Sequence, residues 1–191
     1  MKIGTCVNFS EIDGMGKKFA RLREHNFDSC QLVSWNPAAW TDENASLLKT
    51  LLEQYQITVS AFWCGWSGPA AWNFYDGPLT LGLVPVEYRQ MRIENLCDGA
   101  DFAHKLGITD VVTHMGFIPE NPYDPNFSSF CIAVRTVAEH LKKNGQCLLF
   151  ETGQETPVTM LRCFEAVGTD NLYVNLDTAN LILYGKANPA D

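Results

Sequence analysis

The sequence has 191 residues, of which 46% are hydrophobic and 19% are charged, the balance of a globular protein with a sizeable core. Its 14 lysines and arginines are scattered among 22 acidic residues, so the formal net charge is −8 and no basic surface is available to nucleic acid or to an anionic membrane. No apolar run approaches the roughly 18 residues of a spanning helix, and no signal peptide is recognised. We therefore expect one cytoplasmic domain that comprises residues 1–191.

Short β-rich runs alternate with longer segments of helical period along the chain. The runs predicted as strands are Ile3–Val7, Cys30–Trp35, Ile57–Trp63, Asp110–His114, Cys147–Glu151 and Leu172–Asp177. Because these runs are almost continuously apolar, they are typical of parallel strands that helices cover on both faces. The helices predicted between them are Lys17–His25, Asp42–Tyr55, Val86–Leu106, Cys131–Lys143 and Val158–Val167.

Capping residues mark several of the predicted helix boundaries. Thr41 and Thr156 are typical of helix starts, and the second is followed directly by a proline. For the helix that begins at Cys131, the residue before it that suits a cap is Ser128 or Ser129. A sixth helix is expected to begin only near Asn188.

The seven cysteines are widely spaced and include no C-x-x-C pair. They are Cys6, Cys30, Cys64, Cys97, Cys131, Cys147 and Cys163. An odd number without such a pair indicates neither a disulfide framework nor a zinc knuckle. We expect reduced thiols that act mostly as small core residues.

The alternation of strands and helices predicts an α/β protein, for which two architectures compete. A doubly wound sheet normally carries a glycine-rich turn after an early strand, and the sequence has neither G-x-G-x-x-G nor a phosphate loop there. A (β/α)₈ barrel carries its chemistry at the carboxyl ends of its strands. Polar and aromatic residues cluster at those ends here, namely Asn8, Trp35, Asn36, Trp63, Trp66, His114, Glu151 and Asp177.

The length of the chain limits how much of such a barrel it can form. TIM barrels typically have about 250 residues, and this sequence supplies about six βα units, without strands seven and eight. The fold class we predict is therefore an incomplete barrel. An open six-stranded sheet leaves two edges unpaired, which indicates that another segment or another copy covers them and makes a homo-oligomer a candidate assembly.

Two carboxylates stand at the ends of adjacent predicted strands. Glu151 lies in F-E-T-G-Q-E-T-P, and Asp177 lies in N-L-D-T-A-N. Adjacent strand ends can bring both carboxylates within reach of one metal ion, and such oxygen ligands suit Mg, Mn or Zn. The alternative is that both carboxylates only cap the turns or helices that follow them.

Other residues near the strand ends are candidates for substrate contacts. His114 is a candidate ligand or hydrogen-bond donor, or else a core histidine bonded to the backbone. Trp35 and Trp66 could hold the flat apolar face of a sugar, or could pack a long loop over the barrel. Glu155 and Asn180 could bind substrate hydroxyls, or could cap helices.

With these residues identified, the chain resembles the sugar phosphate isomerase/epimerase superfamily, the xylose isomerase-like TIM barrels. The resemblance covers the whole chain. It depends on A-x-x-L-G (103–107), V-V-T-H-M-G (111–116), F-E-T-G-Q-E-T-P (150–157) and N-L-D-T-A-N-L-I-L-Y-G (175–185), of which the last two together are fairly specific. It implies that residues 1–191 form the amino-terminal part of such a barrel.

The resemblance also implies roles for individual residues. Family members hold a divalent metal with a glutamate on strand five, an aspartate on strand six, a histidine on strand seven and a glutamate on strand eight. Glu151 and Asp177 match the first two, and Glu151 would also be one of two acid/base groups. The D-x-x-H that is frequent after strand six is D-T-A-N here, so Asn180 replaces the histidine that touches substrate.

The function implied by this resemblance is a metal-dependent isomerase or epimerase of a small keto-sugar or polyol ketone. A carboxylate would remove the proton alpha to the carbonyl through an enediolate, with Mn, Mg, Zn or Co as cofactor. With half of the metal site, this chain is expected to turn over weakly or not at all. The alternatives are a metal-dependent phosphodiesterase of the endonuclease IV type and a non-catalytic sugar-binding barrel.

Overall fold

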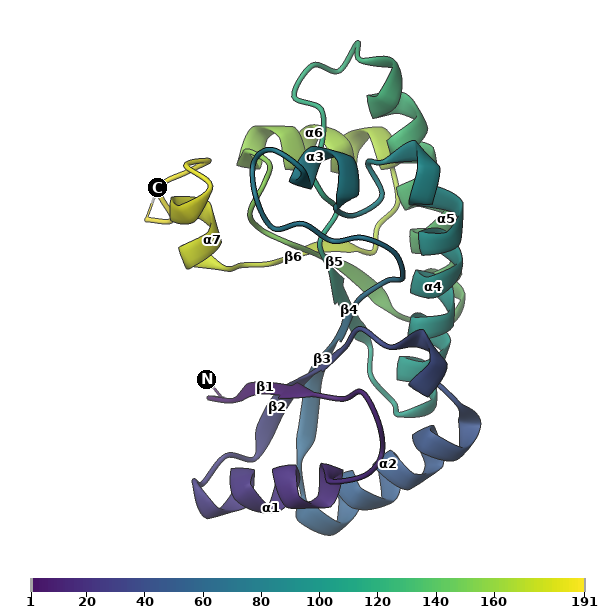
Figure 1. Cartoon of the computed structure of the whole chain (residues 1–191), viewed down its shortest axis with the longest axis vertical. Coiled ribbons are helices and arrows are strands. Elements are labelled where there is room, and N and C mark those ends of the chain that lie inside the picture. The colour runs from purple at the N-terminus through teal and green to yellow at the C-terminus, as the bar shows by residue number, and fades with distance from the viewer. Residues whose placement is uncertain (1, 191) are drawn as a thin grey trace.

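A single parallel sheet forms the centre of the computed structural model, which describes residues 2–190 (Figure 1). Its strands follow one another in chain order, β1-β2-β3-β4-β5-β6, and every neighbouring pair is parallel. The strands are β1 (Thr5–Asn8), β2 (Ser29–Ser34), β3 (Thr58–Cys64), β4 (Asp110–Thr113), β5 (Cys147–Glu151) and β6 (Leu172–Asn175). This order confirms the predicted α/β class and the incomplete barrel of six βα units.

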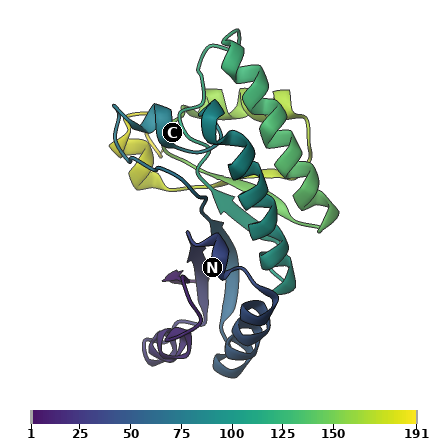
Figure 2. The ribbon, with the colours of Figure 1, turned by 45° about the vertical axis from the view of Figure 1, so that its right-hand side comes forward.

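Helices cover the outer side of the curved sheet, and both ends of the chain lie on its open side (Figures 1 and 2). The long helices are α1 (Met15–Glu24), α2 (Asp42–Tyr55), α4 (Val86–Lys105), α5 (Pro125–Lys143) and α6 (Pro157–Val167). Shorter ones are the 3₁₀-helix η1 (Pro37–Ala39), α3 (Gly77–Thr80) and α7 (Thr178–Leu183). No helix among residues 2–190 is long and apolar enough to cross a membrane.

The core fills the space between the sheet and the helices. Leu32, Phe62 and Phe150 point from three strands into this layer and are fully buried. The Phe62 ring packs against Phe102 of α4, with ring centroids 5.7 Å apart. Because successive residues of a strand point to opposite faces, the residues between these positions point to the inner, concave side of the sheet.

Two helices begin several residues earlier than predicted, whereas the starts of the other predicted helices agree to within two residues. Helix α5 starts at Pro125, because the Asp124 side chain accepts a hydrogen bond from the Asn126 N–H (2.7 Å) and the proline suits the first turn. Helix α7 starts at Thr178, about ten residues before the expected position, because Asp177 caps it. The same cap ends β6 at Asn175 rather than at the predicted Asp177.

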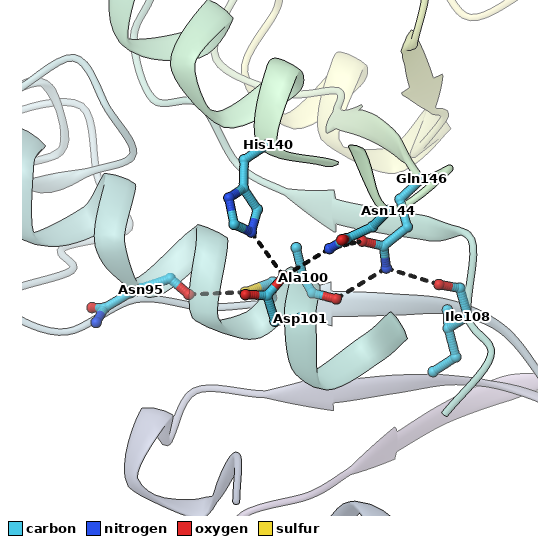
Figure 3. A network of polar contacts seen from close by, with 8 residues as sticks. Asn95, Ala100, Asp101, Ile108, His140, Asn144 and Gln146 are labelled. Carbon is cyan, nitrogen blue, oxygen red and sulfur yellow. Dashed lines mark hydrogen bonds and ion pairs between the residues drawn. The ribbon is translucent and has the colours of Figure 1, made fainter. Parts of the chain in front are cut away.

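A polar network ties α4, α5 and the turn before β5 together (Figure 3). The Asp101 carboxylate accepts hydrogen bonds from His140 Nε2 (2.8 Å) and Asn144 Nδ2 (2.7 Å), and Gln146 donates to two backbone carbonyl groups. Burial alone would raise the pKa of Asp101, but the bonds from Asn144 and His140 outweigh it and lower that pKa. This network lies toward the amino-terminal ends of the strands, where residues of a barrel support stability rather than chemistry.

Candidate functional site

An open cavity of about 690 Å³ lies on the concave side of the sheet. All six strands or the loops directly after them contribute side chains to it. The lining residues are Cys6, Gln31, Val33, Trp35, Trp63, Trp72, His114, Glu151, Asn175, Leu176, Asp177 and Thr178. The cavity thus places tryptophans and carboxylates around one space, where barrel enzymes carry their active sites.

Glu151, the last residue of β5, is 6% exposed and faces this cavity. Its Oε2 accepts a hydrogen bond from Asn175 Nδ2 of β6. Burial raises the pKa of Glu151 from 4.5 to about 7, and the nearby charge of Asp177 adds to the rise, while Asn175 and Trp63 oppose it. Glu151 can therefore both accept and release a proton near neutral pH.

Asp177 both lines the cavity and caps α7. Its Oδ1 accepts hydrogen bonds from the N–H groups of Ala179 (2.8 Å) and Asn180 (3.2 Å). The Thr152 hydroxyl, directly after β5, accepts from the Asp177 N–H (2.7 Å) and donates to its carbonyl (3.0 Å). Capping therefore accounts for one carboxylate oxygen of Asp177 and holds the ends of β5 and β6 together.

Glu151 and Asp177 are the candidate ligands for a divalent metal in this cavity. They line the same cavity, and the negative charge of Asp177 raises the pKa of Glu151, a repulsion that a bound cation would relieve. Carboxylate oxygens are also the ligands that hard divalent ions prefer. Within residues 2–190, however, no cluster of three or more His, Cys, Asp or Glu side chains could hold a metal.

His114 follows β4 and is 7% exposed. Its Nδ1 is buried without a hydrogen-bond partner, and its ring lies against Trp63 and Trp72, with centroids 5.3 and 4.8 Å apart. Burial lowers the pKa of His114 to about 4, although Gln154 and Asp177 act in the opposite direction. The imidazole is therefore neutral at pH 7, and its unbonded Nδ1 is shielded from solvent.

Tryptophans form one wall of the cavity. Trp35 is 38% exposed, and its ring lies 5.1 Å from Trp63, 4.9 Å from Trp66 and 5.9 Å from Trp72, measured between centroids. Trp66, which the sequence indicated as a substrate contact, is 3% exposed and is not among the lining residues. It supports Trp35 from behind, whereas Trp63 and Trp72 face the cavity.

The position of Trp35 requires a glycine at residue 65. A Cβ added to Gly65 would lie 2.5 Å from two atoms of the Trp35 ring. We predict that Gly65→Ala displaces this ring and lowers the free energy of unfolding by about 1–3 kcal/mol. Gly16→Ala, in α1, is the control because its added Cβ meets only ordinary contacts at 3.6 Å or more.

Urea unfolding and near-ultraviolet circular dichroism, which reports on tryptophan packing, measure the two effects. Gly16→Ala should keep the wild-type spectrum and should be at least as stable as the wild type, because alanine favours the helix over glycine. An unchanged spectrum in Gly65→Ala would show that residue 65 does not hold Trp35 in place.

Two buried arginines of α4 hold the long loop that carries Trp66 and Trp72. Arg92 is fully buried and donates to the carbonyl groups of Gly82 (2.7 Å) and Pro69 (2.8 Å). Its guanidinium lies 5.2 Å from the Trp66 ring centroid. Arg89 donates to the carbonyls at residues 83 and 84 (both 2.6 Å). The loop is therefore anchored to α4 through its backbone.

Besides Trp66, two more of the expected substrate contacts lie outside the cavity lining. Glu155 is 2% exposed, neither of its carboxylate oxygens has a hydrogen-bond partner, and it lines a separate apolar cavity of about 240 Å³ beside α6 and β6. Burial raises the pKa of Glu155 to about 7. Asn180 lies in the first turn of α7, where its N–H donates to Asp177. The structure thus brings together Glu151, Asp177, His114 and Trp35, and not these two.

Sequence reasoning missed several lining residues, above all Gln31 and Asn175. A signal for both was present, because side chains two residues apart in a strand share a face. Gln31 shares the inner face with Val33, and Asn175 precedes Asp177 by two positions. A polar residue at such a position in an apolar run indicates a partner inside the barrel.

An incomplete parallel barrel with two carboxylates at the carboxyl ends of its strands has the architecture of a (β/α)₈ barrel, and enzymes of that fold carry their active sites at this end. The chain belongs to the xylose isomerase-like TIM barrel family, whose model matches residues 19–191. No curated protein sequence matches it.

Several solved structures share the fold. A xylose isomerase domain protein from Planctomyces limnophilus is 30% identical, with a TM-score of 0.89 over 98% of this chain and 67% of its own. An L-ribulose 3-epimerase is 21% identical, with a TM-score of 0.72 over 96% of this chain and 63% of its own. A xylose isomerase-like TIM barrel protein from Mycobacterium smegmatis, solved in complex with magnesium, is 22% identical, with a TM-score of 0.69 over 93% of this chain and 60% of its own. The chain thus spans about two thirds or less of these structures' length.

Proposed function

We propose that this chain is part of a metal-dependent isomerase or epimerase that acts on a small keto-sugar or polyol ketone. The observation that carries the proposal is the cavity itself, in which Glu151 and Asp177 face a wall of tryptophans. A sugar presents hydroxyl groups at its edge and apolar C–H groups on its faces. Carboxylates and tryptophans match these two surfaces.

Glu151 is the residue to which we assign proton transfer. Its ionised carboxylate, which faces the cavity, can remove the proton alpha to a carbonyl, and the carboxylic acid so formed can return one. Glu151 and Asp177 would hold the metal, with Mn, Mg, Zn or Co as candidates, and when bound it would supply positive charge for the developing oxyanion.

The remaining side chains around Glu151 orient the substrate. His114, which lines the cavity and is neutral at pH 7, presents its imidazole ring to a substrate hydroxyl group. The rings of Trp35, Trp63 and Trp72 pack against the sugar face and keep water from the reacting carbon.

Turnover by the 191-residue chain is expected to be slow, because the described part of the chain supplies only two metal ligands. Within residues 2–190, the sheet edge formed by β6 is also uncovered. The apolar side chains of β6, of α7 and of the link between them that are 43–70% exposed are Tyr173, Val174, Leu176, Ile182 and Leu183.

The test measures proton exchange rather than net conversion, because exchange detects even slow enolisation. The chain is incubated with Mn²⁺ in deuterated water with a panel of keto-sugars and inososes, and proton NMR follows the loss of the signal alpha to the carbonyl. We expect Mn²⁺-dependent exchange with at least one of them. Sugar binding that quenches tryptophan fluorescence equally with and without Mn²⁺, and without exchange, would instead support a non-catalytic sugar-binding barrel.

A further inference from the structure

A chain of side-chain hydrogen bonds crosses the concave side of the sheet and ends on Glu151. Cys6 of β1 lies 3.9 Å from Gln31 Oε1. Gln31 Nε2 of β2 donates to Asn175 Oδ1 of β6 at 2.9 Å, and Asn175 Nδ2 donates to Glu151 Oε2 of β5. We name Gln31 and Asn175 the amide relay. It joins β2 and β6, which are not neighbours in the sheet.

The ionised form of Glu151 determines the direction of every bond in the relay. A carboxylate can only accept hydrogen bonds, so Asn175 must present its NH₂ group to Glu151. Its carbonyl oxygen then faces Gln31, which must present its own NH₂ group. The Gln31 carbonyl is left to accept the proton of the Cys6 thiol. One arrangement of donors therefore satisfies all four groups, and in it each donor points toward Glu151.

The relay is costly as a purely structural device. The interior of a TIM barrel is normally filled by bulky apolar side chains such as valine, isoleucine and leucine, which pack without needing partners. An amide that is partly removed from water loses free energy unless its hydrogen bonds are replaced. Gln31 and Asn175 are both half-buried. They form hydrogen bonds with each other, and Asn175 also donates one to Glu151.

We propose that Gln31 and Asn175 are positioning residues that hold the Glu151 carboxylate with Oε2 bonded to the relay, so that its other oxygen is available to a metal. This inference rests on the proposed function, in which Glu151 is a metal ligand. Side chains that orient a metal ligand typically affect metal affinity about 10- to 100-fold when they are removed. Gln31 contacts Glu151 only through Asn175, so its effect must depend on Asn175.

The test is a double-mutant cycle on Mn²⁺ affinity, with Gln31→Met, Asn175→Leu and the double variant of the 191-residue chain. Electron paramagnetic resonance of free Mn²⁺ gives the dissociation constant. We expect losses of about tenfold for Gln31→Met and about 10- to 100-fold for Asn175→Leu, with no further loss in the double variant. Ser60→Ala, which removes a different side-chain bond to β2 (3.1 Å), is the control and should retain wild-type affinity.

A second measurement needs neither metal nor substrate. Proton–nitrogen NMR spectra record the side-chain amide signal of Asn175. Carbon NMR records the carboxyl signal of Glu151, which accepts a hydrogen bond from that amide. We expect Gln31→Met to shift both signals, and Ser60→Ala to shift neither. This measurement also identifies any variant that fails to fold, because the signals of an unfolded chain lose their dispersion. If Gln31→Met fails to fold, Gln31→Glu replaces it, since glutamate has a similar size but cannot donate a hydrogen bond to Asn175 when it is ionised.

The outcomes separate the relay from the proposed function. The relay would be overturned, even if metal binds, if the losses of Mn²⁺ affinity in the two single variants added up in the double variant. It would also be overturned if those losses were no larger than the loss in Ser60→Ala. If the wild-type chain binds no Mn²⁺, the proposed function fails, and the NMR signals decide the relay alone. In that case, the relay would be overturned if Gln31→Met left the NMR signals of Asn175 and Glu151 unchanged. It would be supported if Gln31→Met shifted both signals.

Discussion

Replacement of Glu151 by glutamine is expected to weaken Mn²⁺ binding at least about a hundredfold, because loss of a partner of a ligand alone costs about 10- to 100-fold and this change removes the charge of a ligand itself. Glutamine retains the size and one oxygen of the side chain, so the cavity keeps its shape. The same variant should abolish deuterium exchange into the keto-sugar, since glutamine cannot take up the proton. Both effects follow from the placement of Glu151 beside Asp177 in the cavity.

Although Glu151→Gln should weaken metal binding, it should raise the free energy of unfolding of the metal-free protein. Burial raises the pKa of Glu151 from 4.5 to about 7. The stability associated with the protonated form is therefore fully present below about pH 4.5 and is lost as the pH rises through 7. Because a tenfold change in equilibrium is worth about 1.4 kcal/mol, Glu151→Gln should stabilise the metal-free protein at about pH 8 by up to about 3 kcal/mol.

Urea unfolding at several pH values, beside Mn²⁺ titration, measures both effects of Glu151→Gln. Glu165→Gln, on the exposed surface of α6, is the matched control and should change neither quantity. Loss of metal affinity together with loss of stability would contradict the expectation, because it would mean that Glu151 serves the fold rather than the site.

Replacement of Arg92 by methionine is expected to lower the free energy of unfolding by about 3–5 kcal/mol. The Arg92 side chain is fully buried, and its removal leaves the carbonyl groups of Gly82 and Pro69 without partners, at about 1–3 kcal/mol each. The cation–π contact with Trp66 is lost as well. Methionine recovers part of the packing, and burial lowers the pKa of Arg92 to about 10, so its charge is costly already in the native protein.

Arg135 offers a matched control for Arg92. It also donates to two carbonyl groups, those of Val167 and Ala166 (both 2.7 Å), but its side chain is exposed on α5. Water can replace these bonds, so Arg135→Met should cost less than about 1 kcal/mol. Urea unfolding gives both values, and near-ultraviolet circular dichroism should change only for Arg92→Met, whose loop carries Trp66 and Trp72. Equal costs for the two variants would contradict the assignment of Arg92 as the anchor of this loop.

The sequence by itself determined the order and type of the main elements. Apolar runs of strand length are patterns of neighbouring residues and can be read without knowing the strand's partner. Helix caps such as Thr41 and Thr156 are local as well, because each bonds a backbone N–H only three residues further along the chain. The same holds for the strand-end position of Glu151, which follows directly from the length of its apolar run. Two predicted boundaries were wrong: Asp124 was not identified as a cap, and Asp177 was considered as a cap while the next helix was still expected only near Asn188.

Only the tertiary structure decided which of the strand-end residues share a cavity. The sequence indicated Trp66 as a sugar contact, yet the loop held by Arg92 turns Trp66 inward and leaves Trp72 at the cavity. Gln31 and Asn175 are 144 positions apart and belong to strands that do not pair, so no local pattern joins them. The curvature of the sheet brings them together, and curvature depends on the packing of all strands and helices at once.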